Sequence, residues 1–192
     1  MSSVSSQSPS SSSSPSPFAD VKSCDEIHWP DWKATDLATL TFVFRATEQG
    51  DEILLIRKKR GLGAGKVNGP GGRLEGDESP AQCAVREVQE ELGVTPIRPE
   101  HVGKLYFQFV DGYGLEVFVF KTWTFEGEAY ETDEAVPLWT RADAVPFDEM
   151  WADDHLWFPH MLAGRPFSGR FIFDGDAMLD VDLQEVASAA EA

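Results

Sequence analysis

The chain has 192 residues, 42% of them hydrophobic, which fits one globular domain with a buried core. Its 33 acidic and 16 basic residues give a net charge of −17, which argues against binding to nucleic acid polymers. No apolar stretch approaches the roughly 20 residues that a membrane-spanning helix needs, so a membrane partner is not expected. An anionic small substrate is compatible with this charge if a divalent cation bridges it to the protein.

The chain begins with a segment that is almost entirely serine, proline and glutamine. This composition cannot bury enough apolar surface to offset the cost of ordering it. We therefore predict a disordered tail over 1–24, a folded domain over 25–186 and a frayed end over 187–192. The tail has no basic start followed by an apolar run, so it is not a secretory signal. It is serine-rich like an organelle transit peptide, but its first basic residue is Lys22.

Two strands and a loop follow the tail. Residues 39–45 carry an apolar side chain at every second position, and residues 53–56 form a short apolar run, so both predict strands. The turn-forming residues 47–51 between them indicate a hairpin. Residues 58–72 contain six glycines, which predicts an irregular loop whose backbone approaches another group closely.

The next predicted element is a helix over 80–92. Ser79 is a good N-cap, Pro80 suits the first helical position, and Gly93 suits a left-handed C-terminal cap. Beyond it we predict strands at 106–110, 115–124 and 138–140, a helix at 153–162, and a hairpin of 169–173 with 178–183. Mixed strands with two helices indicate an α/β sandwich. The two cysteines, Cys24 and Cys83, are expected to be reduced structural thiols.

The helix over 80–92 separates charged from apolar side chains. On a helical wheel its acidic face carries Glu87, Glu90 and Glu91, and its opposite face carries Ala81, Val85, Val88 and Leu92. Three carboxylates this close repel one another. They indicate either a solvated surface or a site for a divalent cation such as Mg²⁺, which prefers oxygen ligands. The helix alone is compatible with both interpretations.

A longer, gapped pattern surrounds this acidic face. The second fixed residue follows the first after five positions, and the Arg-Glu pair follows after seven more. The fixed positions are Gly72, Glu78, Arg86, Glu87, Glu90, Glu91 and Gly93, with an apolar residue at Val88 and Val94. This pattern resembles the Nudix box at every fixed position.

The resemblance to Nudix hydrolases implies a fold, a cofactor and a reaction. The implied fold is an α/β/α sandwich with a mixed sheet, and the implied reaction is hydrolysis of a pyrophosphate link. It also implies Mg²⁺, or Mn²⁺ as an alternative, and a pair formed by Arg86 and Glu78 that holds the loop to the helix. The implied metal ligands are Glu87, Glu90, Glu91 and the carbonyl of Gly71, and the implied catalytic residues are Glu91 as general base, Glu87, Arg86 and Glu134.

Within the family, residues 37–186 are similar to the subfamily of animal MutT homologues, the oxidised purine nucleoside triphosphate hydrolases. The similarity implies conversion of 8-oxo-dGTP and 2-hydroxy-dATP to monophosphate and pyrophosphate, which protects DNA by sanitising the nucleotide pool. The implied substrate-binding residues are Thr39, Lys58, Asn68, Gly72, Phe107, Phe109, Trp151, Asp153 and Asp154. The sequence departs from the subfamily at Leu62, Val67 and Ala152.

The chemistry of the implied base site is consistent with this substrate. Oxidation at C8 of guanine converts N7 from an acceptor into an N–H donor, which a carboxylate or an Asn amide can recognise. Two adjacent carboxylates raise one pKa, so that one of Asp153 and Asp154 can be protonated and donate. This would allow one site to bind oxidised guanine and oxidised adenine.

Each residue also has a structural interpretation. Asp153 and Asp154 could cap the second helix, Trp151 and Phe107 could be core aromatics, and Asn68 could be a turn residue. Two other functions remain open: a Nudix hydrolase for another nucleoside diphosphate-linked substrate, and a non-catalytic Nudix binding module. We expect a monomer in the cytoplasm, with the nuclear or mitochondrial pool as alternatives.

Overall fold

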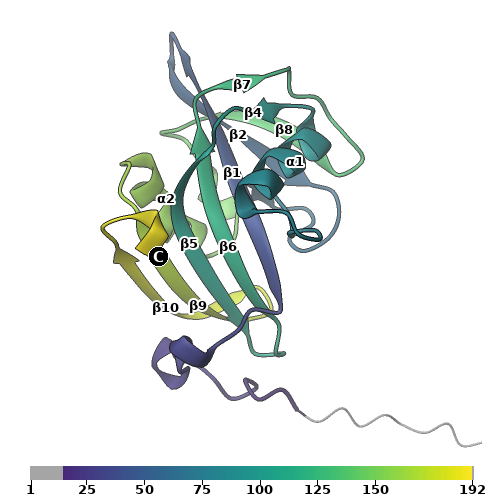
Figure 1. Cartoon of the computed structure of the whole chain (residues 1–192). Helices are drawn as coiled ribbons and strands as arrows, with labels where there is room; N and C mark the ends of the chain where they lie inside the picture. The colour runs from purple at the N-terminus through teal and green to yellow at the C-terminus, as the bar shows by residue number, and fades with distance from the viewer. Residues whose placement is uncertain (1–14, 192) are drawn as a thin grey trace, which may run out of the picture.

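The central sheet is built from three antiparallel hairpins and two parallel contacts between them (Figure 1). The computed structural model describes residues 15–191. In chain order the strands and α-helices are β1 Asp36–Thr47, β2 Gly50–Lys58, β3 Val67–Asn68, α1 Pro80–Leu92, β4 Thr95–Pro96, β5 Glu100–Phe109, β6 Gly114–Thr122, β7 Phe125–Glu126, β8 Ala135–Arg141, α2 Asp154–Leu162, β9 Phe167–Asp174 and β10 Ala177–Glu185.

The sheet is mixed, as the sequence predicts. Its strand order is β10-β9-β5-β6-β1-β2-β3, and β8 pairs with β2. β1 runs parallel to β6 and β5 runs parallel to β9, whereas the hairpin partners are antiparallel. The small strands β4 and β7 form a separate two-stranded sheet.

The alternation of side chains along β1 and β2 places the two helices on opposite faces. Phe42 of β1 packs with Trp157 and Phe158 of α2, with ring centroids 5.8 and 4.9 Å apart. Val43 next to it points the other way and shares a buried cluster with Val88 of α1. Successive strand residues face opposite sides, so one strand supports both layers. The predicted α/β/α sandwich is confirmed.

The predicted elements agree with the observed ones except at their ends and in the shortest strands. Both predicted hairpins and both helices are present, and the strands β5 and β6 form a third hairpin. The strand predicted at 138–140 is longer and extends over Ala135–Arg141. The two-residue strands β3, β4 and β7 were not predicted, because a run of two residues carries no periodicity.

The prediction of a disordered tail over 1–24 is wrong for its last part. Residues 1–14 lie outside the described residues, but residues 15–24 pack against the sheet. Phe18 and Val21 contact a buried cluster formed by Cys24, Ile27 and Ile172 of β9. The backbone N–H of Cys24 donates to Asp180 at 2.7 Å. Apolar residues within this segment cover the end of the sheet, and the chain continues from it through two short 3-10 turns, η1 Cys24–Glu26 and η2 Trp29–Asp31.

Two further features concern the chain end and the membrane. A 3-10 turn, η4 Ala189–Glu191, lies where a frayed end is predicted, and the buried Ala189 packs it onto the domain. A third such turn, η3 Phe147–Glu149, precedes α2. Among the described residues, no helix has the length and apolar character needed to cross a bilayer.

Candidate functional site

The acidic helix α1 is fixed at both ends by its own sequence. The hydroxyl of Ser79 accepts from the N–H of Gln82, and the Gln82 side chain accepts in return from the N–H of Ser79 at 2.8 Å. Gly93 ends the helix with a φ of 72° and donates its N–H to the carbonyl of Gln89. Both predicted caps are confirmed. A capped helix holds its side chains in a fixed rotational position.

The buried face of α1 is rotated from the predicted one. Ala81 is exposed, whereas Glu91, which the sequence places opposite the apolar residues, is only 2% exposed. The buried face consists of Cys83, Ala84, Val88, Glu91 and Leu92. The helix is covered by the glycine-rich loop as well as by the sheet, so one acidic side chain lies underneath the loop.

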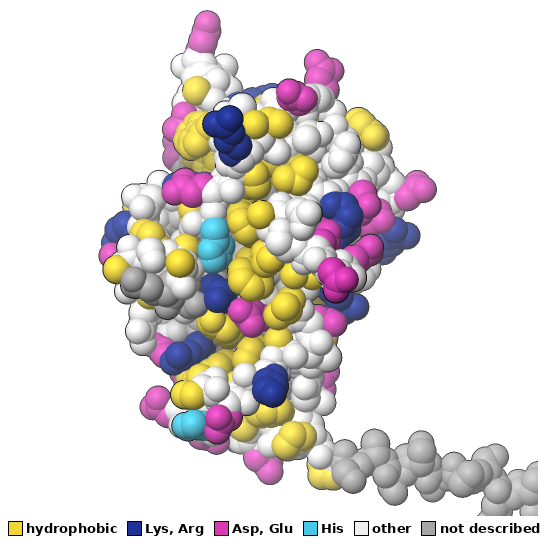
Figure 2. Space-filling view, in the orientation of Figure 1, with side chains coloured by type: hydrophobic (Ala, Val, Ile, Leu, Met, Phe, Trp, Pro, Cys, Tyr) yellow, Lys and Arg dark blue, Asp and Glu magenta, His cyan; other side chains and the backbone are white. Residues whose placement is uncertain are grey.

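Arg86 joins the loop to the helix and neutralises part of the acidic face. Its Nε and Nη2 donate to the two carboxylate oxygens of Glu78 at 3.0 and 2.6 Å. The hydrogen bond from Arg86 lowers the pKa of Glu78 to about 2. Nη1 of Arg86 donates to Glu87 at 2.8 Å and to Glu90 at 2.9 Å. The predicted Arg86–Glu78 pair is therefore present, and the same guanidinium contacts two predicted metal ligands (Figure 2 shows side chains of both charges together over α1).

Glu91 has different partners. Its Oε2 accepts from the N–H of Gly71 at 2.9 Å, and its Oε1 lies 3.6 Å from Nζ of Lys58. Burial raises the pKa of Glu91 to about 7, against the opposing effect of Lys58 and the Gly71 hydrogen bond. The side chain therefore connects α1 to both the glycine-rich loop and β2.

The glycines at this contact are required by close packing. A Cβ on Gly71 would lie 2.0 Å from the carbonyl oxygen of Thr39, and a Cβ on Gly72 would lie 2.4 Å from Oε1 of Glu87. A larger residue at position 71 would require a backbone shift, whereas a larger residue at position 72 would displace the Glu87 side chain. The loop therefore places backbone polar groups directly against the acids of α1.

The donor set around α1 has the chemistry that a hard divalent cation needs. Carboxylate oxygens and a backbone carbonyl are the ligands that Mg²⁺ prefers. Within residues 15–191, however, no group of three His, Cys, Asp or Glu side chains is arranged to hold a metal ion. Glu87 and Glu90 point to Arg86, whereas Glu91 points to Gly71 and Lys58. Glu134 forms an ion pair with Arg60, and its charge contributes to the raised pKa of Glu91.

All nine predicted substrate-binding residues line one cavity of about 310 Å³ beside this helix. They come from distant parts of the chain: β1, β2, β3, the glycine-rich loop, β5 and the start of α2. The cavity is lined by Thr39, Lys58, Asn68, Gly72, Phe107, Phe109, Trp151, Asp153 and Asp154, together with Gly71. Because Gly71 and Lys58 also contact Glu91, the cavity opens directly onto the acidic helix.

The aromatic wall of the cavity includes one residue that the sequence did not indicate. Phe173 of β9 lies at the centre of the wall, with its ring centroid 5.9 Å from Trp151, 6.0 Å from Phe107 and 5.6 Å from Phe109. It is the register partner of Phe109 across the parallel β5–β9 contact. A pairing between strands this far apart in sequence leaves no local pattern, so no sequence signal could have identified Phe173.

Asp153 and Asp154 are both buried at the cavity wall. Oδ2 of Asp153 accepts from the indole N–H of Trp157 at 2.9 Å, and Oδ2 of Asp154 accepts from the backbone N–H of Trp151 at 2.9 Å. Burial raises the pKa of Asp153 to about 6. Burial and then the charge of Asp153 raise the pKa of Asp154 well above its ordinary value. Asp153 is the N-cap residue of α2, but its side chain makes no capping hydrogen bond.

The remaining predicted residues have individual environments. The hydroxyl of Thr39 is buried and lies 3.4 Å from Sγ of Cys83, a buried free thiol beneath the loop. Oδ1 of Asn68 accepts from the N–H of Gly69 at 2.8 Å. Leu62, one of the departures from the subfamily, lines the cavity. Other lining residues that the sequence did not indicate are Ala38, Leu40, Gly61, Arg73, Tyr113, Leu115 and Val117.

Comparisons with known proteins agree with this geometry. The family model described as NUDIX domain matches residues 35–161. The chain is 44% identical over 140 residues to the oxidized purine nucleoside triphosphate hydrolase of Danio rerio, covering 72% of this chain and 90% of that protein. It is 39% identical over 142 residues to the protein of the same name from Mus musculus, covering 73% and 91%. A solved structure of a MutT protein from Bacillus halodurans is similar with a TM-score of 0.69 and 29% identity, covering 78% of this chain and 97% of that one.

Proposed function

This chain belongs to the Nudix hydrolase family, and we propose that it hydrolyses oxidised purine nucleoside triphosphates to monophosphate and pyrophosphate. The observation that carries this proposal is the cavity, which collects all nine expected substrate-binding residues at the edge of the acidic helix. The named relatives from zebrafish and mouse support the same substrate class.

In the proposed arrangement the base enters the cavity and the triphosphate lies over α1. Trp151, Phe107 and Phe109 provide aromatic surfaces for the base. Asp153 and Asp154 face its polar edge, where an ionised carboxylate accepts from the new N7–H of 8-oxoguanine and a protonated one donates. Asn68 supplies an amide for the same purpose.

The acids of α1 are proposed to bind a divalent cation, Mg²⁺ with Mn²⁺ as an alternative. Glu87, Glu90, Glu91 and the carbonyl of Gly71 would hold it. When bound, such a cation neutralises phosphate oxygens and activates a water molecule. Glu91 is the proposed general base and Glu134 the alternative, whereas Arg86 keeps the carboxylates of the helix in position through Glu78.

The decisive experiment is a nucleotide panel with Mg²⁺ on the wild-type protein beside Glu91→Gln. We expect hydrolysis of 8-oxo-dGTP and 2-hydroxy-dATP, measured by chromatography of the nucleotide products, to exceed that of dGTP, ADP-ribose and diadenosine polyphosphates. A preference for one of the last two would identify a Nudix hydrolase of another specificity. Binding of 8-oxo-dGTP without pyrophosphate release would identify a non-catalytic module.

The substrate would be a free nucleotide of the cellular pool. We therefore propose a cytoplasmic location, with the nuclear or mitochondrial pool as alternatives, and from the family resemblance a monomeric state. Cell fractionation and gel filtration would test these two statements.

A further inference from the structure

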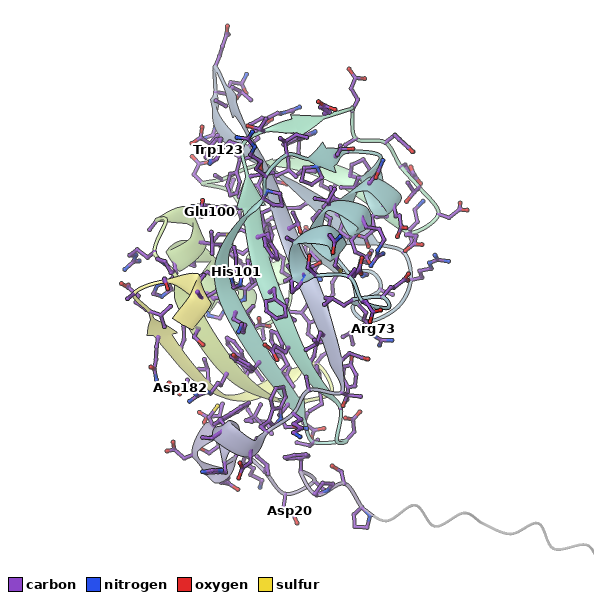
Figure 3. The ribbon with its side chains drawn as sticks, in the orientation of Figure 1. Asp20, Arg73, Glu100, His101, Trp123 and Asp182 are labelled. Atoms are coloured by element: carbon purple, nitrogen blue, oxygen red, sulfur yellow. The ribbon has the colours of Figure 1, made fainter. Side chains whose placement is uncertain are left out.

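Two polar side chains that line the cavity lie outside the nine expected substrate-binding residues: Arg73 and Tyr113. Arg73 directly follows Gly72, and its backbone forms an isolated antiparallel β-bridge with Ala38 of β1. Its carbonyl accepts from Nη2 of Arg86 at 3.0 Å. Figure 3 shows Arg73 in the loop ahead of α1, beside β1. Arg73 therefore lies where the cavity meets the acidic helix.

The guanidinium of Arg73 is held by two side chains from other segments. Its Nε donates to Oδ2 of Asp36 at 3.0 Å, and its Nη2 lies 3.4 Å from the hydroxyl of Tyr113. The Tyr113 hydroxyl donates to the same Asp36 oxygen at 3.0 Å. Each member of the Asp36–Arg73–Tyr113 triad thus contacts both others. The Arg73 side chain is nevertheless 63% exposed, so part of its donor surface is free for a ligand.

The segment ahead of β1 fixes the turn that carries Tyr113. The indole N–H of Trp32 donates to Oε1 of the buried Gln108 at 2.6 Å. Nε2 of Gln108 donates to the carbonyls of Phe109 at 2.8 Å and Tyr113 at 3.1 Å. Thr35 donates its N–H to the carbonyl of Gly114 at 2.7 Å and accepts back through its hydroxyl. This buttress, residues 32–36, keeps the Tyr113 hydroxyl within reach of Arg73.

Charge explains why an arginine at this position matters. The described lining of the cavity contains two cations, Lys58 and Arg73, in a chain of net charge −17. Lys58 is paired with Glu91 of α1. Arg73 is therefore the lining cation whose side chain is not paired with a carboxylate of α1. The base of the proposed nucleotide lies in the cavity and its terminal phosphates lie over α1. Its sugar and first phosphate must therefore lie between the cavity and α1. Guanidinium groups bind phosphate through paired donors.

The geometry points to Arg73 as a substrate-binding residue for the phosphate next to the sugar, with Asp36 and Tyr113 as its positioning residues. This inference rests on the proposed function for the orientation of the nucleotide. It assigns a role to Asp36 at the start of β1 and to the residues just ahead of it, which the sequence had not indicated as part of the site.

The test is equilibrium binding without metal, measured by tryptophan fluorescence, for 8-oxo-dGMP, dGMP and 8-oxo-deoxyguanosine. We expect Arg73→Gln to weaken 8-oxo-dGMP binding about tenfold and to leave binding of the nucleoside, which lacks the phosphate, within about twofold. Arg73→Lys keeps the charge and should recover part of the loss. Arg45→Gln is the matched control, because it removes an arginine paired with Glu52 at 2.6 Å outside the cavity.

The positioning residues have a distinct signature. Asp36→Asn removes a negative charge near the phosphate, so a purely electrostatic effect would tighten 8-oxo-dGMP binding. Positioning predicts the opposite, a loss of about threefold, and the same loss for Tyr113→Phe. Tighter binding by Asp36→Asn would overturn the positioning role.

Other outcomes separate this inference from the proposed function. Equal losses for nucleotide and nucleoside in Arg73→Gln, or no loss, would overturn the phosphate contact. If the wild-type protein binds dGMP as well as 8-oxo-dGMP, the proposed substrate is wrong, but the effect of Arg73→Gln on either monophosphate still decides the contact. If the wild-type protein binds none of the three compounds, both proposals are wrong.

Discussion

Two groups of carboxylates lie at opposite ends of the same site, and their surroundings differ. The glutamates of α1 are paired with cations: Glu87 and Glu90 with Arg86, and Glu91 with Lys58. Asp153 and Asp154 face an aromatic wall, and within residues 15–191 neither forms an ion pair. Their hydrogen-bond donors are a neutral indole and a neutral backbone N–H.

The difference shows how one residue type supports two kinds of chemistry. Carboxylates that are already paired with cationic side chains are suited to bind a metal ion, because a divalent cation carries more positive charge than the side chain it replaces. Buried carboxylates without a cation tend to keep a proton. They are suited to recognise the donors and acceptors of an uncharged base.

The comparison predicts that the two groups of carboxylates can be disabled separately. The largest effect is expected when the glutamates of α1 are disabled and both hydrolysis and base binding are measured. We expect Glu91→Gln, or removal of divalent cations with EDTA, to lower pyrophosphate release from 8-oxo-dGTP by about a hundredfold or more. Binding of 8-oxo-dGMP should change by no more than about twofold, because independent sites behave additively. A Glu91→Gln protein that retains half of the activity would exclude Glu91 as general base.

The second prediction concerns the base end. Asp154→Asn cannot change its protonation, so we expect it to alter the ratio of kcat/KM for 8-oxo-dGTP and 2-hydroxy-dATP by about tenfold. An unchanged ratio would contradict the role of Asp154 in base recognition.

The same residue gives a pH dependence in the wild-type protein. Guanine presents an acceptor at O6, whereas adenine presents a donor at N6. Asp154 is protonated below its raised pKa and ionised above it, with Asp153, Lys66 and His155 as the charged groups that act on this pair. The 8-oxo-dGTP to 2-hydroxy-dATP ratio should therefore fall as pH rises, and this slope should be lost in Asp154→Asn.

A smaller effect is expected where the loop is tied to α1. Glu78→Gln removes a charged partner of Arg86 and should cost about 2 kcal/mol of unfolding free energy, or roughly 5 °C in Tm. The folded pKa of Glu78 is lowered to about 2, so its stabilisation is present above pH 4.5 and is lost as pH falls toward 2. Thermal scans of both proteins should therefore converge near pH 2. A constant difference would mean that the ion pair is not its cause.

The smallest effect is expected at the helix cap. Ser79→Ala removes one of the two reciprocal hydrogen bonds of the capping box and should cost about 1 kcal/mol, or roughly 3 °C in Tm. Because α1 carries the acids that are proposed to bind metal, whereas the base pocket is built from other elements, kcat should respond more than 8-oxo-dGMP binding. Equal effects on both would show that the two ends are mechanically coupled.

The sequence predicted the local elements and the acidic helix well, for identifiable reasons. Ser79, Pro80 and Gly93 specify the ends of α1 through short-range hydrogen bonds and backbone angles. The alternation in 39–45 and the turns between strands specify the hairpins. These signals act within a few residues, so one chain is enough to detect them.

The sequence failed where distant segments meet. Phe173 reaches the cavity only through the β5–β9 register, and Glu91 is buried only because the loop at Gly71 covers it. Phe18 and Val21 look like part of a polar tail until Ile172 provides a surface for them. The nine substrate-binding residues came from resemblance to a family, since nothing local about Thr39 or Lys58 indicates a shared cavity.

The two thiols have a consequence for the conditions under which such a protein can work. Burial raises the pKa of Cys24 to about 12 and that of Cys83 to about 11. Oxidants react with the thiolate, which is scarce in both residues at neutral pH. An enzyme that removes oxidised nucleotides is needed when peroxides are abundant, and this fold keeps its two thiols in their unreactive protonated form.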